Sequence, residues 1–285
     1  MSITDVEINQ LAFSYGKEQL FASLDVGLQR GNMYGLLGKN GAGKTSMLKL
    51  IAGLLFPQAG EVRVFDQEPA DRTPSFLSEI FFLPEDLYLP AMSIREYISI
   101  YAPFYPRFDH EALAARLDEF EVPAGKKLNA LSYGQKKKFL IAFGLASNAA
   151  LCLLDEPTNG LDIPSKSQFR RIAASSLNDD RLFIISTHQV RDLEQLIDPV
   201  IIIDEGKIIF LQTYDEIVQR ISIRHVRSLP REEQIIFQQQ EINGYRIVTA
   251  QDGNTETSID LETLFNAVLS DPVRMAGVFT KEHVG

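Results

Sequence analysis

Cysteine is nearly absent from the chain, and so is any long run of apolar residues. The single cysteine, Cys152, has no partner for an intrachain disulfide, which is typical of a reducing compartment. No segment approaches the roughly 18 apolar residues that a membrane-spanning helix needs. Residues 1–8 have neither the basic nor the apolar region of a signal peptide. We therefore expect a cytoplasmic protein that reaches a membrane only through a partner chain.

Basic residues are also in deficit, because the chain has 28 lysines and arginines against 38 acidic residues, a formal net charge of −10. Sequence-independent binding to nucleic acid requires a basic surface that displaces counterions, so no nucleic-acid partner is expected. The same negative charge disfavours direct contact with anionic lipid. A length of 285 residues with 45% apolar content fits one large globular domain, or one domain with a small appendage.

Short apolar segments and helical patterns alternate along most of the chain. The segments with strand character are residues 6–13, 20–26, 33–37, 61–65, 80–83, 151–154, 182–186 and 200–203. Helical periodicity marks residues 45–55, 165–177 and 190–196, and an inserted stretch at about 86–144 is mainly helical. Because parallel strands are connected by helices that cover the sheet, this order predicts an α/β fold with a mostly parallel sheet.

The character of the sequence changes near residue 221. Beyond it, residues 245–250 and 255–259 read as strands joined by an Asp-Gly turn, and a last helical pattern follows. We therefore expect a main domain over residues 1–221 and a small α/β accessory domain over residues 222–285.

A glycine-rich loop lies between the apolar run at 33–37 and the helical pattern that follows. It consists of Gly38, Lys39, Asn40, Gly41, Ala42, Gly43, Lys44 and Thr45, and Ser46 comes next. Glycines allow successive backbone N–H groups to turn toward phosphate oxygens, and a helix N-terminus favours negative charge. In such a loop Lys44 reaches the β- and γ-phosphates, and the Thr45 hydroxyl is placed to bind Mg²⁺. The alternative is a glycine-rich turn that matches by chance, and the strand before it and the helix after it argue against that.

Two acidic residues follow the apolar strand at 151–154. Asp155 ends that strand at the carboxyl edge of the sheet, where α/β folds bind ligands. Asp155 is there placed to support Mg²⁺, and Glu156 to polarise an attacking water. Taken alone the pair fits solvated acids at a strand exit, but beside a phosphate loop it predicts a site for nucleotide hydrolysis.

These elements occur together with others in an order that resembles the ATPase subunits of ATP-binding cassette (ABC) transporters. In sequence order the matching pieces are Tyr15, the loop at 38–45, Leu131-Ser-Tyr-Gly-Gln135, Asp155 with Glu156, Asn159-Gly-Leu-Asp162 and Ser186-Thr-His188. The resemblance covers about residues 3–220, and this joint occurrence is more specific than any one motif. It implies a P-loop NTPase fold with an N-terminal antiparallel β subdomain and an inserted helical subdomain.

The resemblance also implies roles for single residues of the site. Tyr15 would stack on the adenine ring, with strand packing as the alternative interpretation and Phe13 as the competing aromatic residue. His188 would contact the γ-phosphate and help to hold the attacking water. ATP is then the substrate, and Mg²⁺ its metal ion.

In this family two ATPase domains bind head to tail and enclose two ATP molecules. The residues that would contact the ATP bound by the partner are Ser132, Gly134, Gln135 and Asp162. Asp162 also fits a structural role as the cap of the following helix. We therefore expect a second ATPase subunit as a partner, most simply a second copy of this chain.

The chain departs from the family pattern at two positions. Glu85 stands where the family commonly has glutamine, so a carboxylate would add negative charge near Asp155 and Glu156. Glu85 remains a candidate Mg²⁺ ligand, with a solvated loop acid as the alternative. Tyr133 stands where the family usually has glycine, and a bulky ring there hinders close backbone approach unless it points outward.

Three consecutive lysines follow, at residues 136–138. With a net negative chain and no interleaved aromatic residues, a solvated helix face is the simplest interpretation. The alternative is that these lysines complement the ATP of the facing chain.

The favoured hypothesis is a Mg²⁺-dependent ATPase subunit, peripheral on the inner face of the cell membrane, that drives a separately encoded permease, with export as the favoured direction. Residues 86–144 would then present the surface that contacts the permease. One alternative is an ABC ATPase that acts as a clamp in translation or DNA repair, although this chain has one phosphate loop and no sustained heptads. Another is a P-loop kinase, which has no use for a segment such as 132–135 that completes a neighbour's site.

Overall fold

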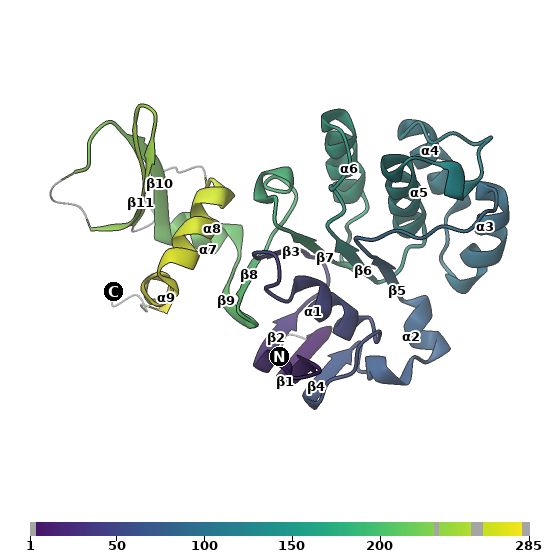
Figure 1. Ribbon diagram of the computed structural model, residues 1–285, viewed down its shortest axis with the longest axis horizontal. Helices are drawn as coiled ribbons and strands as arrows, with labels where there is room; N and C mark the ends of the chain where they lie inside the picture. Colours follow the sequence, from purple (N-terminus) through teal and green to yellow (C-terminus); the bar gives the residue numbers. More distant parts are fainter. Residues whose placement is uncertain (1–3, 231–233, 252–258, 281–285) are drawn as a thin grey trace.

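The computed structural model describes residues 4–230, 234–251 and 259–280, and a six-stranded sheet lies at its centre (Figure 1). The order of its strands is β5 (Ile80–Leu83), β6 (Leu151–Asp155), β7 (Leu182–Thr187), β3 (Met33–Leu37), β8 (Val200–Asp204) and β9 (Lys207–Gln212). The first five strands are parallel, and β9 pairs antiparallel with β8. The predicted α/β fold with a mostly parallel sheet is therefore confirmed.

Alternate residues of this sheet face two separate hydrophobic cores. In β6, Leu151 and Leu153 belong to one core, whereas Cys152 and Leu154 belong to the other. Side chains alternate across a strand, so a strand that is apolar at every position must be covered on both faces. The continuous apolar runs in the sequence reflect this double burial.

One face of the central sheet is covered by the N-terminal region. The antiparallel strands β2 (Glu18–Leu28), β1 (Val6–Tyr15) and β4 (Ala59–Val64) form a sheet in that order. Their apolar side chains share one core with α1 (Lys44–Ile51) and with the central strands. A short helix, α2 (Pro74–Ser78), then leads into β5. The N-terminal antiparallel subdomain implied by the resemblance is present.

The other face is covered by helices. α3 (Ile94–Tyr101), α4 (His110–Glu119) and α5 (Tyr133–Ala146) gather at one end of the molecule, and α6 (Ile163–Ser175) follows β6 (Figure 1). α5 is buried along most of its length because it packs on both the sheet and the neighbouring helices. Its Phe143 contacts aromatic rings of α3 and β5, which joins the inserted helices to the central sheet.

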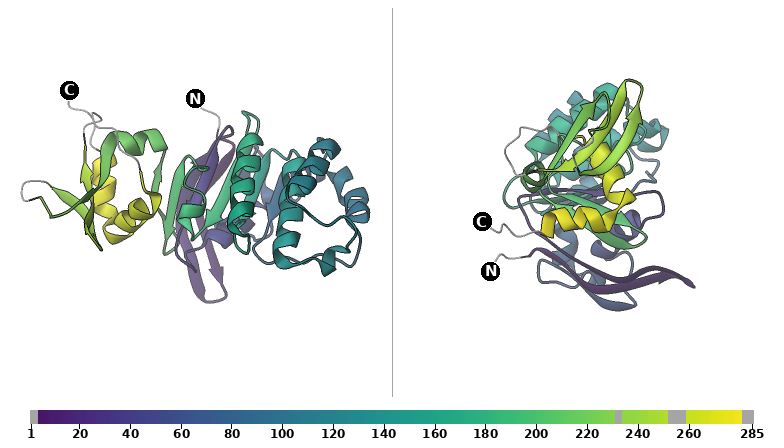
Figure 2. Two further views of the ribbon diagram at one scale, coloured as in Figure 1. Left: turned by 90° about the horizontal axis from the view of Figure 1, so that it is seen from above. Right: turned by 90° about the vertical axis from the view of Figure 1, so that its left-hand side faces the viewer.

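The C-terminal region forms a further small sheet. After α7 (Tyr214–Arg220), the strands β10 (Ile221–Val226), β12 (Gly244–Ala250) and β11 (Ile235–Glu241) pair antiparallel in that order, and α8 (Leu261–Ser270) and α9 (Pro272–Thr280) complete the region. Figures 1 and 2 show this region and the α3–α5 helices at opposite ends of the molecule. The start of α8 contacts the segment between β7 and β8, because the Leu261 N–H donates to the Glu194 carboxylate at 2.8 Å.

Several local predictions need correction. Residues 190–196 do not form a helix, because only a 3₁₀ turn at Val190–Asp192 is present. The helix predicted for 45–55 ends at Ile51. The sequence patterns missed β9, β10, β11 and α9, and the predicted Asp-Gly turn and most of the strand at 255–259 lie outside the described residues. Within the described ranges, no helix has both the length and the apolar character needed to cross a membrane.

Candidate active site

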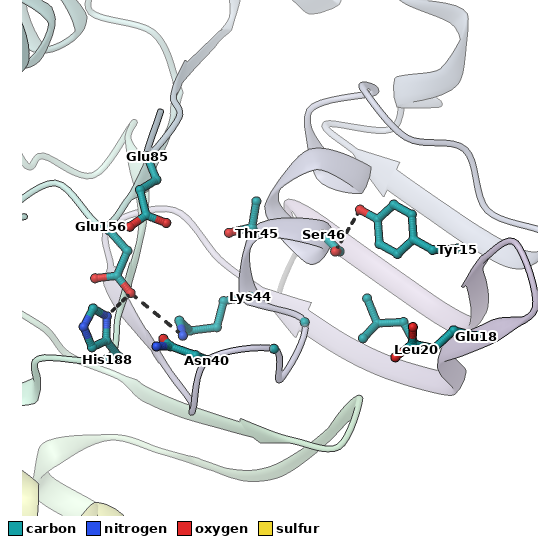
Figure 3. Close-up of a pocket in the computed structure, with 12 residues that line it drawn as sticks. Tyr15, Glu18, Leu20, Asn40, Lys44, Thr45, Ser46, Glu85, Glu156 and His188 are labelled. Atoms are coloured by element: carbon teal, nitrogen blue, oxygen red, sulfur yellow. Dashed lines mark hydrogen bonds and ion pairs between the residues drawn. The ribbon is translucent and has the colours of Figure 1, made fainter. Parts of the chain in front are cut away.

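A cavity of about 470 Å³ lies between the β1–β2 hairpin and the carboxyl edge of the central sheet (Figure 3). Its lining residues are Tyr15, Glu18, Leu20, Asn40, Gly41, Gly43, Lys44, Thr45, Ser46, Glu85, Glu156 and His188. Residues that are far apart in the sequence thus meet at one place. Most of them were predicted as site residues, but Glu18 and Leu20 were not, and their nearness to Tyr15 in the hairpin is the only sequence signal for them.

The glycines of the loop are required by its shape. Gly41 and Gly43 have φ angles of +82° and +110°, which side chains disfavour. A Cβ atom at Gly43 would lie 2.7 Å from the Phe21 ring, and one at Gly38 would lie 2.7 Å from the Ile203 carbonyl oxygen. The loop therefore packs closely against β2 and β8 and leads directly into α1. The first N–H groups of α1 have no partner within the helix, which favours an anionic group at this point.

Lys44 is folded into the base of the loop. Its Nζ donates to the carbonyl oxygens of Gly38 at 2.8 Å and Lys39 at 3.2 Å, and lies 3.8 Å from Glu156 Oε1. Burial lowers the pKa of Lys44, and the neighbouring carboxylates oppose that shift. An ammonium has three N–H donors, so one is free for a ligand oxygen while two hold the side chain in place.

The acids at the end of β6 are oriented by the neighbouring strand. Asp155 pairs in register with Ser186 of β7, whose hydroxyl donates to the Asp155 carboxylate. Asp155 is fully buried and also accepts a hydrogen bond from the Thr45 hydroxyl at 2.7 Å. Parallel strands end at the same edge of a sheet, which brings the loop after β3 and the end of β6 together.

Glu156 and His188 form a close pair inside the cavity (Figure 3). His188 Nδ1 lies 2.7 Å from Glu156 Oε1, and the Thr187 hydroxyl donates to Oε2 at 3.2 Å. An ionised carboxylate can only accept, so Nδ1 carries the proton in this contact. The Glu156 side chain is buried and fixed from two sides, which suits a group that must act in one orientation.

Tyr15, rather than Phe13, faces the cavity. Tyr15 is 50% exposed, and its hydroxyl lies 3.1 Å from Ser46 Oγ (Figure 3). Phe13 is buried and packs edge to face against the Tyr15 ring, with 4.9 Å between ring centres. The alternative that gave Phe13 the site role is therefore wrong, and the Tyr15 ring is held at the open end of the cavity.

Glu85 is part of a bridge at the rim of the cavity. Its Oε1 accepts from Asn159 Nδ2 at 3.1 Å, and its main-chain oxygen accepts from the Tyr133 hydroxyl at 2.8 Å. Gln189, next to His188, donates to Asn159 Oδ1 at 3.2 Å. Glu85 is exposed and bonds to Asn159 as well, so its role as a Mg²⁺ ligand stays a prediction beside the alternative of a solvated loop acid.

The other predicted site residues lie outside the cavity. Ser132 caps α5 by a capping box with Gln135, and Asp162 caps α6 by accepting from the Ser165 N–H at 2.9 Å. Gly134 packs on the loop between β6 and α6, since a Cβ atom at Gly134 would lie 2.9 Å from the Gly160 carbonyl oxygen. These residues therefore do not line the cavity of their own chain. Four more predicted residues do not line the cavity, namely Gly38, Lys39, Ala42 and Asp155.

The Tyr133 side chain is 43% exposed, and its ring lies against its own chain. A Cβ atom at Gly160 would lie 2.5 Å from the Tyr133 ring, so the ring rests on that glycine. It turns toward its own chain, because its hydroxyl bonds to the main chain of Glu85. The Tyr133 side chain therefore holds the main chain at Glu85 in place through this hydrogen bond.

Sequence reasoning missed Lys137. The interpretation of residues 136–138 as a solvated face is wrong for this lysine, which is fully buried and donates to the Glu156 main-chain oxygen at 2.6 Å. Burial lowers the pKa of Lys137 to about 8, and Glu85 is the first of the acids that oppose this shift.

Comparison with known proteins gives a consistent result. Residues 21–159 match the model of the ABC transporter family. The chain is 27% identical to the ABC transporter ATP-binding protein YtrB of Bacillus subtilis over 74% of its length and 73% of that protein. It is 30% identical to the bacitracin transport ATP-binding protein BcrA of Bacillus licheniformis over 76% of its length and 72% of that protein.

A solved structure shares the fold. A dimeric ATP-binding cassette in a post-hydrolysis state with ADP and Pi matches with a TM-score of 0.63 and 21% identity, over 73% of this chain and 98% of that chain.

Proposed function

Because the chain belongs to the ABC transporter family as an ATP-binding ATPase, we propose that it powers a separate membrane permease, in the export direction. The relatives support the direction, since one of them is named for bacitracin transport and others for Nod factor export. The hydrolytic part rests on one observation, which is the buried Glu156 carboxylate held between Lys44 and His188 at the cavity. Each residue role below is part of this proposal.

The two ends of the cavity would bind different parts of ATP. At its open end the Tyr15 ring offers a flat face to the adenine base. At its closed end Lys44 and the α1 N-terminus bind the β- and γ-phosphates. Glu156 accepts a proton from the attacking water, and His188 keeps the carboxylate oriented through Nδ1 while its ring lines the cavity.

The residues at the closed end fit Mg²⁺. The Thr45 hydroxyl, the Asp155 carboxylate and the Glu85 carboxylate supply oxygen atoms, the ligands that this ion prefers. Within the described residues, no group of three or more His, Cys, Asp or Glu side chains is placed to hold a metal alone. Phosphate oxygens and water would therefore complete the coordination. Bound there, Mg²⁺ would offset the charge of the phosphates.

We further propose that two chains act together. Ser132, Gln135 and Asp162 are exposed or partly exposed at helix starts outside their own cavity. A second chain placed head to tail would set these groups against the γ-phosphate of its partner. The related dimer with ADP and Pi supports this arrangement. Loss of the γ-phosphate would then weaken contact between the chains.

The α3–α4 region is proposed as the surface that contacts the permease. Tyr88 and Phe104 are 90% and 66% exposed there, although large apolar side chains are usually buried. A hollow of about 320 Å³ between α3 and α4 is lined by Ile98, Pro103, Phe108 and other residues. An amphipathic segment of a membrane protein is the partner that such a surface fits.

Replacing both Tyr88 and Phe104 with serine is expected to uncouple the subunit from its permease. Removing two exposed apolar anchors would lower co-purification of the permease from membranes by about 10-fold or more, since interface anchors often contribute over 2 kcal/mol each. Basal ATP hydrolysis by the isolated chain should stay within about 2-fold, because both residues lie outside the cavity.

The control is Ile242→Ser, because Ile242 is fully exposed and lies between β11 and β12 of the C-terminal sheet, outside the α3–α4 region. Full permease recovery and transport by the double variant would contradict the assignment of this surface. Loss of ATPase activity together with transport would show damage to the cassette instead.

Tyr15→Ala is expected to weaken ATP binding by about 10-fold, as stacking on one base contributes roughly 1–3 kcal/mol. Tyr15→Phe keeps the ring and loses only the contact with Ser46, so its affinity should stay within about 3-fold of the native chain. Titration with a fluorescent ATP analogue measures both. Equal affinities for Tyr15→Ala and the native chain would remove Tyr15 from the base site.

The region after residue 221 is proposed as an accessory domain that comprises residues 222–285. Its described strands form their own sheet, β10-β12-β11. Its α8 meets the segment that follows His188, through the Leu261–Glu194 hydrogen bond and an ion pair between Arg191 and Glu262. The region is therefore in contact with the end of the main sheet that carries the site.

A further inference from the structure

One lysine of α5 is unlike its two neighbours. Lys137 has no exposed surface, whereas Lys136 and Lys138 are partly exposed. The Lys137 Nζ donates to the Glu156 main-chain oxygen at 2.6 Å and lies 5.2 Å from the centre of the Tyr133 ring. Burial of a lysine is unfavourable unless its ammonium has partners. The contact with Glu156 therefore explains why a lysine is buried at residue 137.

The main chain of Glu156 is held on both sides. Its φ angle is +47°, in the left-handed region that residues with a side chain rarely adopt. The Glu156 N–H donates to the Ser186 carbonyl oxygen at 3.1 Å, and the Glu156 carbonyl oxygen accepts from Lys137 at 2.6 Å and from the Asn159 N–H at 3.2 Å. Such a conformation persists only where its surroundings fix it. Among the groups that hold this main chain, Lys137 is the charged donor and makes the shortest hydrogen bond.

Lys137 also stands among negative charges. The carboxylates that act on its ammonium belong to Glu85, Glu156, Asp155 and Asp86. Among the described residues, no lysine or arginine forms an ion pair with Glu85, whose carboxylate bonds to the neutral amide of Asn159. Glu85 and Glu156 line the same cavity, so their charges repel. Lys44 and Lys137 are both buried ammonium groups on which these carboxylates act, and Lys137 is the one that does not line the cavity.

We propose that Lys137 is a positioning residue for ATP hydrolysis, which fixes the main chain of Glu156 and offsets the charge of Glu85. This inference rests on the proposed role of Glu156. Lys137 does not line the cavity and contacts no reacting atom, so it acts only through its neighbours. Tyr133 covers the ammonium from the other side and ties the Glu85 main chain to the same helix. Hydrolysis, rather than nucleotide binding, is therefore the property that depends on Lys137.

Lys137→Met tests this role in the full-length chain, because methionine keeps much of the buried volume and removes the charge and the hydrogen bond. We expect kcat for ATP hydrolysis to fall about 10- to 100-fold, as for loss of a hydrogen bond from a charged donor, while KM for ATP stays within about 3-fold. Lys126→Met is the matched control, since Lys126 is exposed, and its kcat should be unchanged. Melting temperature and ATP titration report whether each variant folds.

A double-mutant cycle with Glu85→Gln tests the charge. With the Glu85 carboxylate gone, Lys137→Met should lower kcat at least about 3-fold less than it does in the native background. Equal effects in the two backgrounds would overturn the proposal, and so would a Lys137→Met variant with native kcat or with KM raised as much as kcat falls. Glu156→Gln is assayed in parallel. Native turnover by that variant would reject the proposed function itself, whereas failure of Lys137→Met alone would reject only this inference.

Discussion

Replacing Glu156 with glutamine is expected to reduce ATP turnover by about 10²- to 10⁴-fold, the range that a positioned general base contributes. Glutamine has the same shape and keeps one oxygen toward His188, but it cannot accept a proton from water. Lys44 and the loop backbone are left in place, so ATP should bind within about 3-fold of the native affinity. Steady-state phosphate release and ATP titration measure the two effects separately.

The same variant should also accumulate as an ATP-bound dimer. If hydrolysis is what separates the chains, then a chain that binds ATP without hydrolysing it will stay paired, and size-exclusion chromatography with ATP will show the dimer. Glu61→Gln makes the same chemical change at an exposed position on β4 and should behave as the native chain. Normal turnover by Glu156→Gln would reject Glu156 as the base. Glu85 is the carboxylate to examine next, because it lines the same cavity.

The phosphate-binding end of the site was predictable from local sequence. A loop that must bring backbone N–H groups together needs glycine at positions such as Gly43, and its lysine and threonine follow at once, so the whole chemistry lies within one segment. The central sheet was predictable for a related reason. Strands buried on both faces must be apolar throughout, and such runs stand out between helical patterns.

Lys137 was not predictable, because the partner that makes its burial possible is distant in sequence. Its donor bond goes to the Glu156 carbonyl, which only the packing of α5 against the end of β6 brings within reach. In the sequence, Lys137 is one of three equivalent lysines. The orientation of the Tyr133 ring was not predictable for the same reason, since the Glu85 oxygen that its hydroxyl contacts lies in another part of the chain.

Two of the C-terminal strands, β10 and β11, escaped prediction for a different reason. In β11, Gln238, Gln239 and Gln240 are all exposed, so this strand lacks the alternation of apolar and polar residues that marks a half-buried strand. Its pairing with β12 is carried by backbone hydrogen bonds, which leave no trace in side-chain pattern. A strand with few buried apolar residues, such as β11, is therefore difficult to predict from residue type.

Lys44→Ala is expected to weaken ATP binding by about 100-fold or more. Lys44 is the buried cation at the closed end of the cavity, and a charged hydrogen bond to phosphate in such a place exceeds the strength of an exposed one. Its removal also frees Glu156 from the ammonium that lies 3.8 Å away, so that an unbalanced carboxylate would face the phosphates. Both effects act in the same direction, and affinity should fall together with turnover.

Isothermal titration with ATP, and the rise in melting temperature that ATP causes, measure this loss directly. Lys49→Ala is the matched control, because Lys49 lies in the last turn of the same helix, away from the cavity, and its removal should leave affinity within about 2-fold. Lys44→Ala should impair ATP binding and Glu156→Gln should impair ATP hydrolysis, so the two variants should differ in dimer formation. The first should fail to form the ATP-dependent dimer, and the second should accumulate it. Tight ATP binding by Lys44→Ala would mean that the loop backbone alone holds the phosphates, which would contradict the role given to this side chain.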